Sequence, residues 1–194
     1  MSISACAELV RQADPDRFSS VIAAPAEKRA ALFAVYAFNV EVSRAPWVTD
    51  EPMIGKMRLQ WWADALDELA RGGPARKHEV TDALSQIGTS DLWGQLSQVV
   101  ETREWDTEPH AFDDWDHLRD YARGTSGQLF LAAGYSIDAP SDGLLEFGTS
   151  VGMANIFGAV PELKRRQVSI LPSDDPENIA AFAQDERQRL SRAR

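Results

Sequence analysis

The stretch that decides the fold class spans residues 29–42 and reads RAALFAVYAFNVEV. Apolar side chains occupy nearly every position, so they cover all sides of a helix instead of alternating as in a half-buried strand. Asn39 and Glu41 are the polar exceptions. A helix that is apolar on nearly all sides must be enclosed by other elements, and this segment therefore predicts a central helix.

The rest of the 194 residues is also helical in pattern. Strand-like alternation is hard to find, and prolines stand at spacings suited to helix starts and stops. No repeat or linker divides the chain, so we expect an all-α fold in one domain, residues 1–194. The pattern predicts helices near residues 3–12, 26–44, 51–70, 78–88, 91–105, 113–134, 141–160 and 176–193.

Composition limits the possible partners. The chain has 20 basic and 30 acidic residues, a net charge of −10, and a pI near 4.8. Such a charge disfavours nucleic acid and anionic membrane surfaces, and it makes a diphosphate ligand unfavourable unless metal ions intervene.

The cysteine content and the hydropathy pattern indicate the compartment. Cys6 is the single cysteine, which excludes an internal disulfide and a cysteine-based zinc cluster. We expect Cys6 to lie in a mobile terminal segment. No apolar run is long enough to span a bilayer, and the N-terminus lacks the apolar core of a signal peptide. We therefore expect a cytoplasmic protein without a transmembrane segment.

The segment 53–70 predicts an amphipathic helix. Arg58 falls in the middle of its apolar arc, where a guanidinium needs a carboxylate or several carbonyl groups. We therefore hypothesise an ion pair between Arg58 and Glu41. The alternative is that both side chains reach a solvent-exposed rim. The predicted arc consists of Ile54, Met57, Trp61, Trp62, Ala65, Leu66 and Leu69.

The stretch 101–120 contains eight acids and two histidines, so a metal site must be considered. Asp113 and His117 are four residues apart and share a helix face. However, Asp113 and Asp114 also stand where a helix would need a cap and first-turn acids. We favour capping and a solvated acidic face. The short run from Gly124 to Gly127 is interpreted as a close approach between two helices or as a kink.

Several motifs resemble the squalene/phytoene synthase family, over most of the chain from Asp16 to Pro172. The resemblance implies an all-α fold of the terpenoid-synthase type, a helical bundle around a central cavity. It also implies further helices after Arg194, so we expect a C-terminally truncated domain. The motifs are DRF at 16–18, KRA at 28–30, LFAVYAF at 32–38, GMANIF at 152–157 and ILP at 170–172.

Enzymes of this family condense two prenyl diphosphates by using Mg²⁺ held by two aspartate-rich motifs. The four aspartate positions fall at Ser43, Trp47, Ala159 and Leu163 of this chain, so none of them has a carboxylate. Magnesium needs oxygen ligands, and the expected metal sites are therefore absent. We also expect two prolines, Pro46 and Pro161, to interrupt the helices that should carry the motifs.

The chain is similar to a divergent branch of the family that comprises bacterial phytoene-synthase-like proteins and a mitochondrial assembly factor of respiratory complex I. This resemblance implies a non-catalytic role in assembling the respiratory NADH dehydrogenase, or binding of an isoprenoid or other lipid. Respiratory-complex subunits or assembly proteins are the expected partners, and the protein could be peripheral at the inner membrane. No nucleic acid and no cofactor are expected.

Two alternatives remain open. One is an active prenyl transferase that depends on Mg²⁺, and the other is a degraded fragment without function, which predicts an unfolded or aggregating chain. Trp61 and Trp62 suit a cavity lining but also suit an ordinary core, which we favour. The candidate cavity or binding residues are Arg29, Tyr36, Asn39, Glu41, Arg58, Trp61, Trp62, Asn155 and Glu162.

Overall fold

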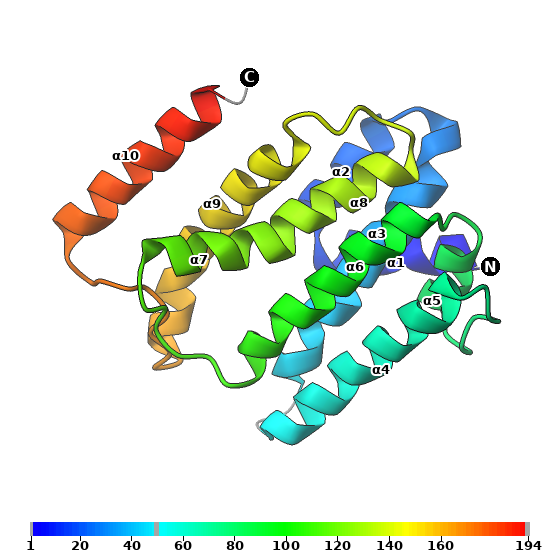
Figure 1. The fold of residues 1–194 in the computed structure, drawn as a ribbon, viewed down its shortest axis with the longest axis horizontal. Helices are drawn as coiled ribbons and strands as arrows, with labels where there is room; N and C mark the ends of the chain where they lie inside the picture. The colour runs from blue at the N-terminus through cyan, green and yellow to red at the C-terminus, as the bar shows by residue number, and fades with distance from the viewer. Residues whose placement is uncertain (1, 49–50, 193–194) are drawn as a thin grey trace.

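The computed structural model describes residues 2–48 and 51–192, and within them the chain is all-α, without a strand (Figure 1). Three short segments, a 3₁₀ turn η1, a 3₁₀ turn η2 and one π-helical turn η3, extend or join the helices. The elements are α1 (Ser2–Ala13), α2 (Pro15–Ala23), α3 (Ala26–Arg44), η1 (Ala45–Trp47), α4 (Pro52–Ala70), α5 (Glu79–Ser85), α6 (Ser90–Thr102), η2 (Arg103–Thr107), α7 (Trp115–Ala122), η3 (Arg123–Gly127), α8 (Gln128–Ser136), α9 (Leu144–Arg165) and α10 (Pro176–Arg192).

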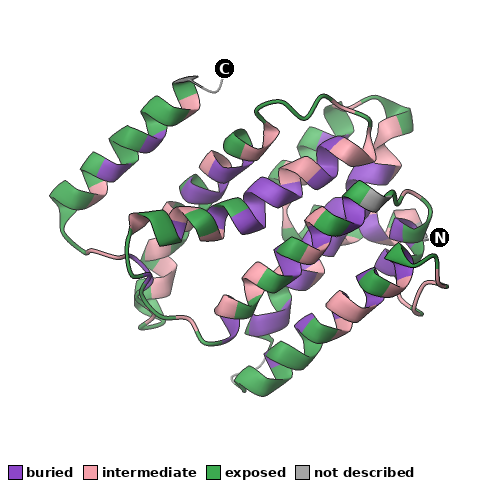
Figure 2. Ribbon diagram, in the orientation of Figure 1, coloured by how far each residue is buried: buried purple, intermediate pink, exposed green. Residues whose placement is uncertain are grey.

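Helix α3 is the central helix, as the sequence predicts. Every residue from 31 to 40 is buried, and α3 contacts α1, α2, α5 and α8 (Figures 1 and 2). Its polar exception Asn39 is only 9% exposed, whereas Glu41 is half-buried. The all-round apolar sequence of α3 is thus matched by neighbours on several sides.

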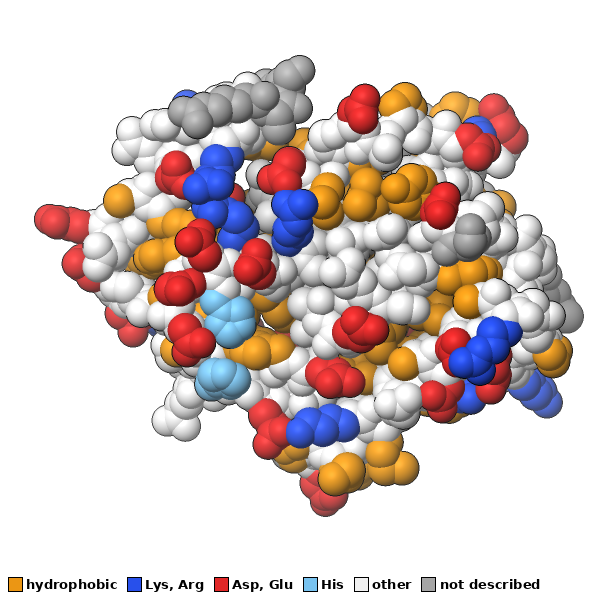
Figure 3. Space-filling model, in the orientation of Figure 1, with side chains coloured by type: hydrophobic (Ala, Val, Ile, Leu, Met, Phe, Trp, Pro, Cys, Tyr) orange, Lys and Arg blue, Asp and Glu red, His pale blue; other side chains and the backbone are white. Residues whose placement is uncertain are grey.

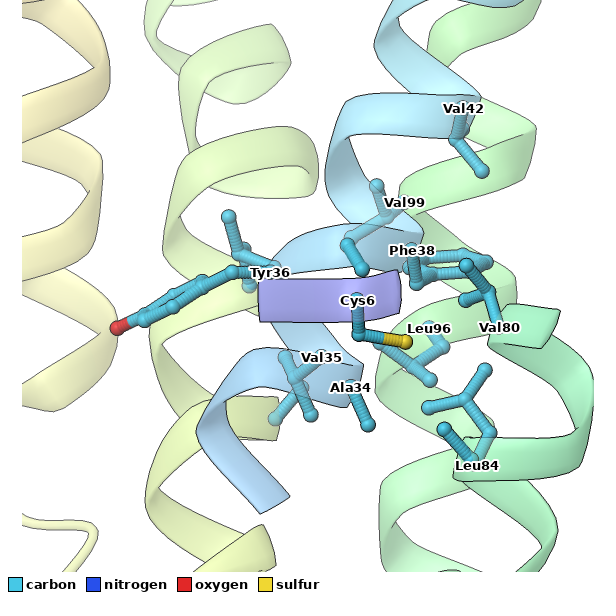
Figure 4. Packing of buried hydrophobic residues seen from close by; sticks show 14 of the residues in the cluster. Cys6, Ala34, Val35, Tyr36, Phe38, Val42, Val80, Leu84, Leu96 and Val99 are labelled. Atoms are coloured by element: carbon cyan, nitrogen blue, oxygen red, sulfur yellow. The ribbon is translucent and has the colours of Figure 1, made fainter. Parts of the chain in front are cut away.

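The larger of two hydrophobic clusters joins α3 to α1, α4, α5, α6 and α8. Cys6 is 1% exposed and lies among Val80, Leu84 and other buried side chains of this cluster (Figure 4). The expectation of a mobile segment around Cys6 is therefore wrong, because α1 packs against α3 and α5. Burial raises the pKa of the Cys6 thiol to about 11.

The second cluster joins the loop before α7, α7, α9 and α10 around Phe112, Leu118, Met153 and Phe182. Helix α10 lies at the outer edge of the molecule (Figure 1). Arg119 of α7 holds α10 through an ion pair with Glu186 and lies 5.3 Å from the centre of the Phe182 ring. Residue 193 of the predicted last helix lies outside the described residues.

The helices α2 and α9 differ from the sequence prediction. Helix α2 is missing from the predicted set, although Asp14 caps it by accepting a hydrogen bond from the Arg17 amide at 3.0 Å and Pro15 occupies its first turn. Helix α9 continues through Pro161 to Arg165, so Pro161 does not interrupt it. Pro161 is exposed, so water can donate to the helix carbonyl oxygen that has no partner because proline lacks an N–H group. Pro46, in contrast, does lie where α3 ends.

The buried face of α4 differs from the predicted arc in its first turns. Trp62, Ala65, Leu66 and Leu69 are buried as predicted, but Ile54 and Met57 are 40% and 65% exposed. Arg58 is also exposed, and no ion pair joins it to Glu41 within the described part of the chain. The reason is that Gly55 and Leu59 face the interior instead, with Gly55 against Pro46.

Glycines bring α9 close to η3, as the interpretation of the Gly124–Gly127 run proposed. A Cβ atom added to Gly152 would lie 2.7 Å from the Ser126 Cβ, and one added to Gly148 would lie 3.0 Å from the Gly127 Cα. Only glycine permits this separation, so the two segments form one tightly packed wall. Among the described helices, none is both long and apolar enough to cross a membrane.

Candidate ligand cavity

A cavity of about 420 Å³ lies where the two halves of the helical bundle meet. Its walls come from α2, α3, η1, η2, α7, η3, α8 and α9, and from the loops around residues 109–112 and 170. Its volume is in the range of small-molecule sites. The lining residues are Asp14, Arg17, Asn39, Ser43, Trp47, Arg103, Trp105, Asp106, Pro109, Phe112, Tyr121, Thr125, Ser126, Leu129, Gly152, Asn155, Ile156, Ala159, Leu163 and Ile170.

One wall carries a connected polar group. Arg103 Nη1 donates to Asp106 Oδ2 at 2.8 Å, and the Tyr121 hydroxyl donates to Asp106 Oδ1 at 2.5 Å. Asp106 is 5% exposed, so its charge depends on these partners. Burial raises the pKa of Tyr121 far above its usual range, with a smaller contribution from the Asp106 charge. Tyr121 therefore remains a neutral donor.

A second ion pair also lines the cavity. Arg17 Nη1 lies 2.5 Å from Asp14 Oδ2, and the guanidinium lies 5.6 Å from the centre of the Tyr36 ring. Each arginine at the cavity thus has its own carboxylate, which leaves a formal charge of zero over the described charged side chains of the lining.

Asn39 differs from these pairs. Its side chain lines the cavity from the buried centre of α3, and its carboxamide has no hydrogen-bond partner within residues 2–48 and 51–192. One turn further on, Ser43 lines the same wall and donates its hydroxyl hydrogen to the Val40 carbonyl at 3.1 Å. Asn155 lines the cavity from α9. The polar atoms that a ligand can meet here are therefore mainly uncharged.

All four positions that the resemblance assigns to the family's aspartates lie on this cavity. Ser43 and Trp47 belong to the α3 and η1 side, and Ala159 and Leu163 belong to α9. Within the part of the chain that the structure describes, no three histidine, cysteine or acidic side chains are grouped to hold a metal ion. The helices thus bring the expected positions together, but those positions present two apolar aliphatic groups, an indole and a hydroxyl.

Several of the other candidate residues lie away from the cavity. Trp62 belongs to the larger hydrophobic cluster, and Trp61 packs against it, which matches the core interpretation that we favoured. Arg29 Nε donates to the Ala24 carbonyl at 2.9 Å and thereby joins α3 to the end of α2. Arg58 is exposed on α4, and Glu162 pairs with Arg165 and Arg166 on the surface.

Two candidates line neighbouring hollows instead. Tyr36 and Arg17 border a mostly apolar hollow of about 460 Å³ together with Leu32 and Phe130. Glu41 lines a hollow of about 490 Å³ next to Cys6 and His78. Arg17 therefore stands between the main cavity and its apolar neighbour.

The sequence pattern does not single out the charged residues of the cavity. Asp106 is one of eight acids in a stretch that was interpreted as solvated, and Tyr121 follows it by fifteen residues. The capping interpretation itself is confirmed, because Asp114 accepts a hydrogen bond from the His117 amide at 2.7 Å. The spacing of Arg103 and Asp106, three residues apart, is the sequence feature that could have indicated their ion pair.

Apolar side chains are exposed near the cavity, where α4 begins (Figure 3). Trp47 lines the cavity and is still 45% exposed, which places it at the cavity mouth. Val48, Met53 and Met57 are also exposed near this end of α4. Trp47 thus supplies an apolar group at the cavity mouth.

An all-α bundle with a cavity between α3 and α9 is the architecture of the terpenoid-synthase type. The squalene/phytoene synthase family model matches residues 10–190, and the chain belongs to this family.

Mammalian relatives of the chain are named "NADH dehydrogenase (ubiquinone) complex I, assembly factor 6". The chain is 26% identical to the Bos taurus and Homo sapiens proteins over 176 residues, which is 87% of this chain and 52% of each relative. It is 30% identical to the Drosophila melanogaster homologue over 178 residues, 86% of this chain and 53% of that protein. The chain thus spans about half the length of these relatives.

Proposed function

We propose that this chain is a non-catalytic member of the squalene/phytoene synthase family that acts in assembly of the respiratory NADH dehydrogenase, and that its cavity binds an isoprenoid or another lipid. The partners in this role are subunits or assembly proteins of the complex. The site of action is the cytoplasm or the surface of the inner membrane.

The observation that carries the proposal is the match over 87% of this chain to proteins named as complex I assembly factors. The cavity chemistry supports the non-catalytic part. Binding two prenyl diphosphates requires several divalent ions, and these ions need carboxylate oxygens. Ser43, Trp47, Ala159 and Leu163 offer no carboxylate at the positions where the resemblance expects them.

Deletion of the gene in its own host tests the assembly role. We expect a loss of fully assembled NADH dehydrogenase on native gels and a matching loss of NADH oxidation by membranes, with both restored by the wild-type gene. The tagged protein should co-purify with subunits of that complex. Normal amounts of the assembled complex in the deletion strain would contradict the proposal.

An active prenyl transferase is the second candidate, because the family fold and its cavity are retained. Purified protein should be incubated with farnesyl or geranylgeranyl diphosphate and Mg²⁺, and released diphosphate should be measured. We expect no release above a heat-inactivated control. Release that disappears in Ser43→Ala or Glu162→Gln variants would support catalysis and overturn the non-catalytic proposal.

A further inference from the structure

We propose that the cavity recognises a ligand with an apolar tail and an uncharged, oxygen-bearing head, such as an alcohol, ketone or ester, in preference to a diphosphate. This inference rests on the lipid-binding part of the proposed function and specifies the ligand's chemistry. It is carried by three features of the cavity wall: an unpartnered carboxamide, a surplus of donors and a balance of charge.

The unpartnered carboxamide belongs to Asn39. A carboxamide at an otherwise buried position is unfavourable unless its polar atoms have partners, and at a cavity wall a ligand can supply them. Asn39 is 91% buried on the central helix, lines the cavity, and has no side-chain partner in the described part of the chain. Because a carboxamide both donates and accepts, it can pair with a hydroxyl as well as with a carbonyl group.

Donors exceed free acceptors on the same wall. Arg103, Trp105 and Ser126 all line the cavity, and the buried atoms Arg103 Nε, Trp105 Nε1 and Ser126 Oγ have no hydrogen-bond partner within the described residues. The two nitrogens can only donate, and the hydroxyl can donate as well. The lining carboxylates already accept hydrogen bonds, Asp106 from Arg103 and Tyr121, and Asp14 from Arg17. The lining therefore has unused donors but no unpaired carboxylate, and this suits a ligand oxygen that accepts hydrogen bonds.

Charge decides which kind of oxygen head fits. The two arginines of the lining are each paired with an aspartate, so a diphosphate would meet no uncompensated positive charge. The net charge of the whole chain, −10, further opposes a multiply charged anion. An uncharged head loses much less hydration free energy than a charged one when it enters the cavity, so it needs no compensating charge there. Leu129, Ile156 and Leu163 supply apolar surface for a tail.

A series of probes with the same tail separates the head groups. Farnesol, farnesyl diphosphate and the hydrocarbon farnesene should be titrated into the purified full chain, and binding should be followed by calorimetry or tryptophan fluorescence. We expect farnesol to bind at least tenfold more tightly than farnesyl diphosphate, with or without Mg²⁺, and several-fold more tightly than farnesene. Equal or tighter binding of the diphosphate, equal binding of farnesene, or no binding of farnesol would overturn the proposal.

Asn39 variants test whether the carboxamide recognises the head. In Asn39→Leu we expect the preference for farnesol over farnesene to fall roughly threefold to tenfold, which is the size of one hydrogen bond. The melting temperature of the unliganded protein should change little, because the carboxamide has no hydrogen-bond partner within the described residues. Asn39→Ala is the smaller second variant, and Asn178→Leu on the exposed surface of α10 is the matched control.

The farnesol preference is a ratio measured within each variant, so a general loss of binding does not imitate the effect. An unchanged ratio in both Asn39 variants would overturn the role of the carboxamide. The deletion experiment gives an independent result. Lost NADH dehydrogenase without farnesol binding contradicts only this inference, whereas farnesol binding with a normal complex contradicts only the assembly role.

Discussion

The Tyr121 hydroxyl donates a hydrogen bond of 2.5 Å to Asp106, fifteen residues earlier in the chain. The bond joins helix α7 to the 3₁₀ turn η2. The Asp106 carboxylate is almost fully buried, and it also accepts a hydrogen bond from Arg103. Hydrogen bonds to a charged group in such surroundings are stronger than those between neutral groups. This contact therefore holds η2 and α7 together at the cavity wall.

Replacing Tyr121 by phenylalanine should destabilise the protein. The variant keeps the ring but leaves the buried Asp106 carboxylate with one donor fewer, which should cost about 1–3 kcal/mol. Urea denaturation followed by circular dichroism measures the free energy of unfolding. Tyr135→Phe is the control, because the Tyr135 hydroxyl has no hydrogen bond within the described residues. Equal effects of the two substitutions would contradict the role of the hydroxyl.

Two glycines of α9 predict opposite effects of the same substitution. A Cβ at Gly152 would lie 2.7 Å from the Ser126 Cβ, so Gly152→Ala should force α9 away from η3 at a cost of about 1–3 kcal/mol. No heavy atom lies within 4 Å of a Cβ at Gly158, where alanine should stabilise the helix by roughly 0.5–1 kcal/mol. Thermal melting compares the two. A stable Gly152→Ala variant would show that this wall can move apart freely.

We expect the buried Cys6 thiol to lower the free energy of unfolding at alkaline pH. Burial raises its pKa from 9.0 to about 11, so between these values the unfolded thiol loses its proton while the folded one keeps it. The unfolded state then binds fewer protons, and the free energy of unfolding falls as pH rises. The loss should reach about 2 kcal/mol by pH 11. Wild type should lose this much more stability than Cys6→Ala between pH 8.5 and 11, and parallel curves would contradict the shift.

We expect the ion pair of Arg119 to hold α10 against the rest of the structure. The Arg119 side chain is 14% exposed and pairs with Glu186, which is 11% exposed. Arg119→Ala leaves this largely buried carboxylate with only the more distant Arg189, 3.8 Å away, at a cost of up to about 3 kcal/mol. Limited proteolysis between residues 166 and 175 should become faster. Arg11→Ala is the control, because Arg11 pairs with Glu8 on the exposed surface of α1. Cleavage at the same rate in both variants would contradict the anchoring role.

The central helix was predictable because its sequence is apolar on all sides, and no other environment would accommodate Phe33, Val35 and Phe38 together. The four cavity positions derived from the family resemblance also lie together, since α3 and α9 face one another across the cavity. These features depend on patterns along single helices, which a sequence displays directly.

Contacts between helices were harder to predict. The Glu41–Arg58 pair was wrong because Gly55 lets α4 pack closely on Pro46, which turns Leu59 inward and leaves Arg58 in solvent. The burial of Asp106 could not be predicted from the sequence, because it depends on η2 folding against α7. Periodicity gives the face of an isolated helix, but the rotation of that helix in the bundle depends on where a neighbour can approach.

The two hydrophobic clusters have a consequence for cooperativity. Leu129 of the larger cluster and Phe112 and Ile170 of the smaller one all border the same cavity. The clusters do not pack directly on one another where they border the cavity, so we expect their unfolding to be less tightly coupled there. A bound molecule would contact both clusters and merge their unfolding into one transition, which calorimetry would record as a single sharper peak.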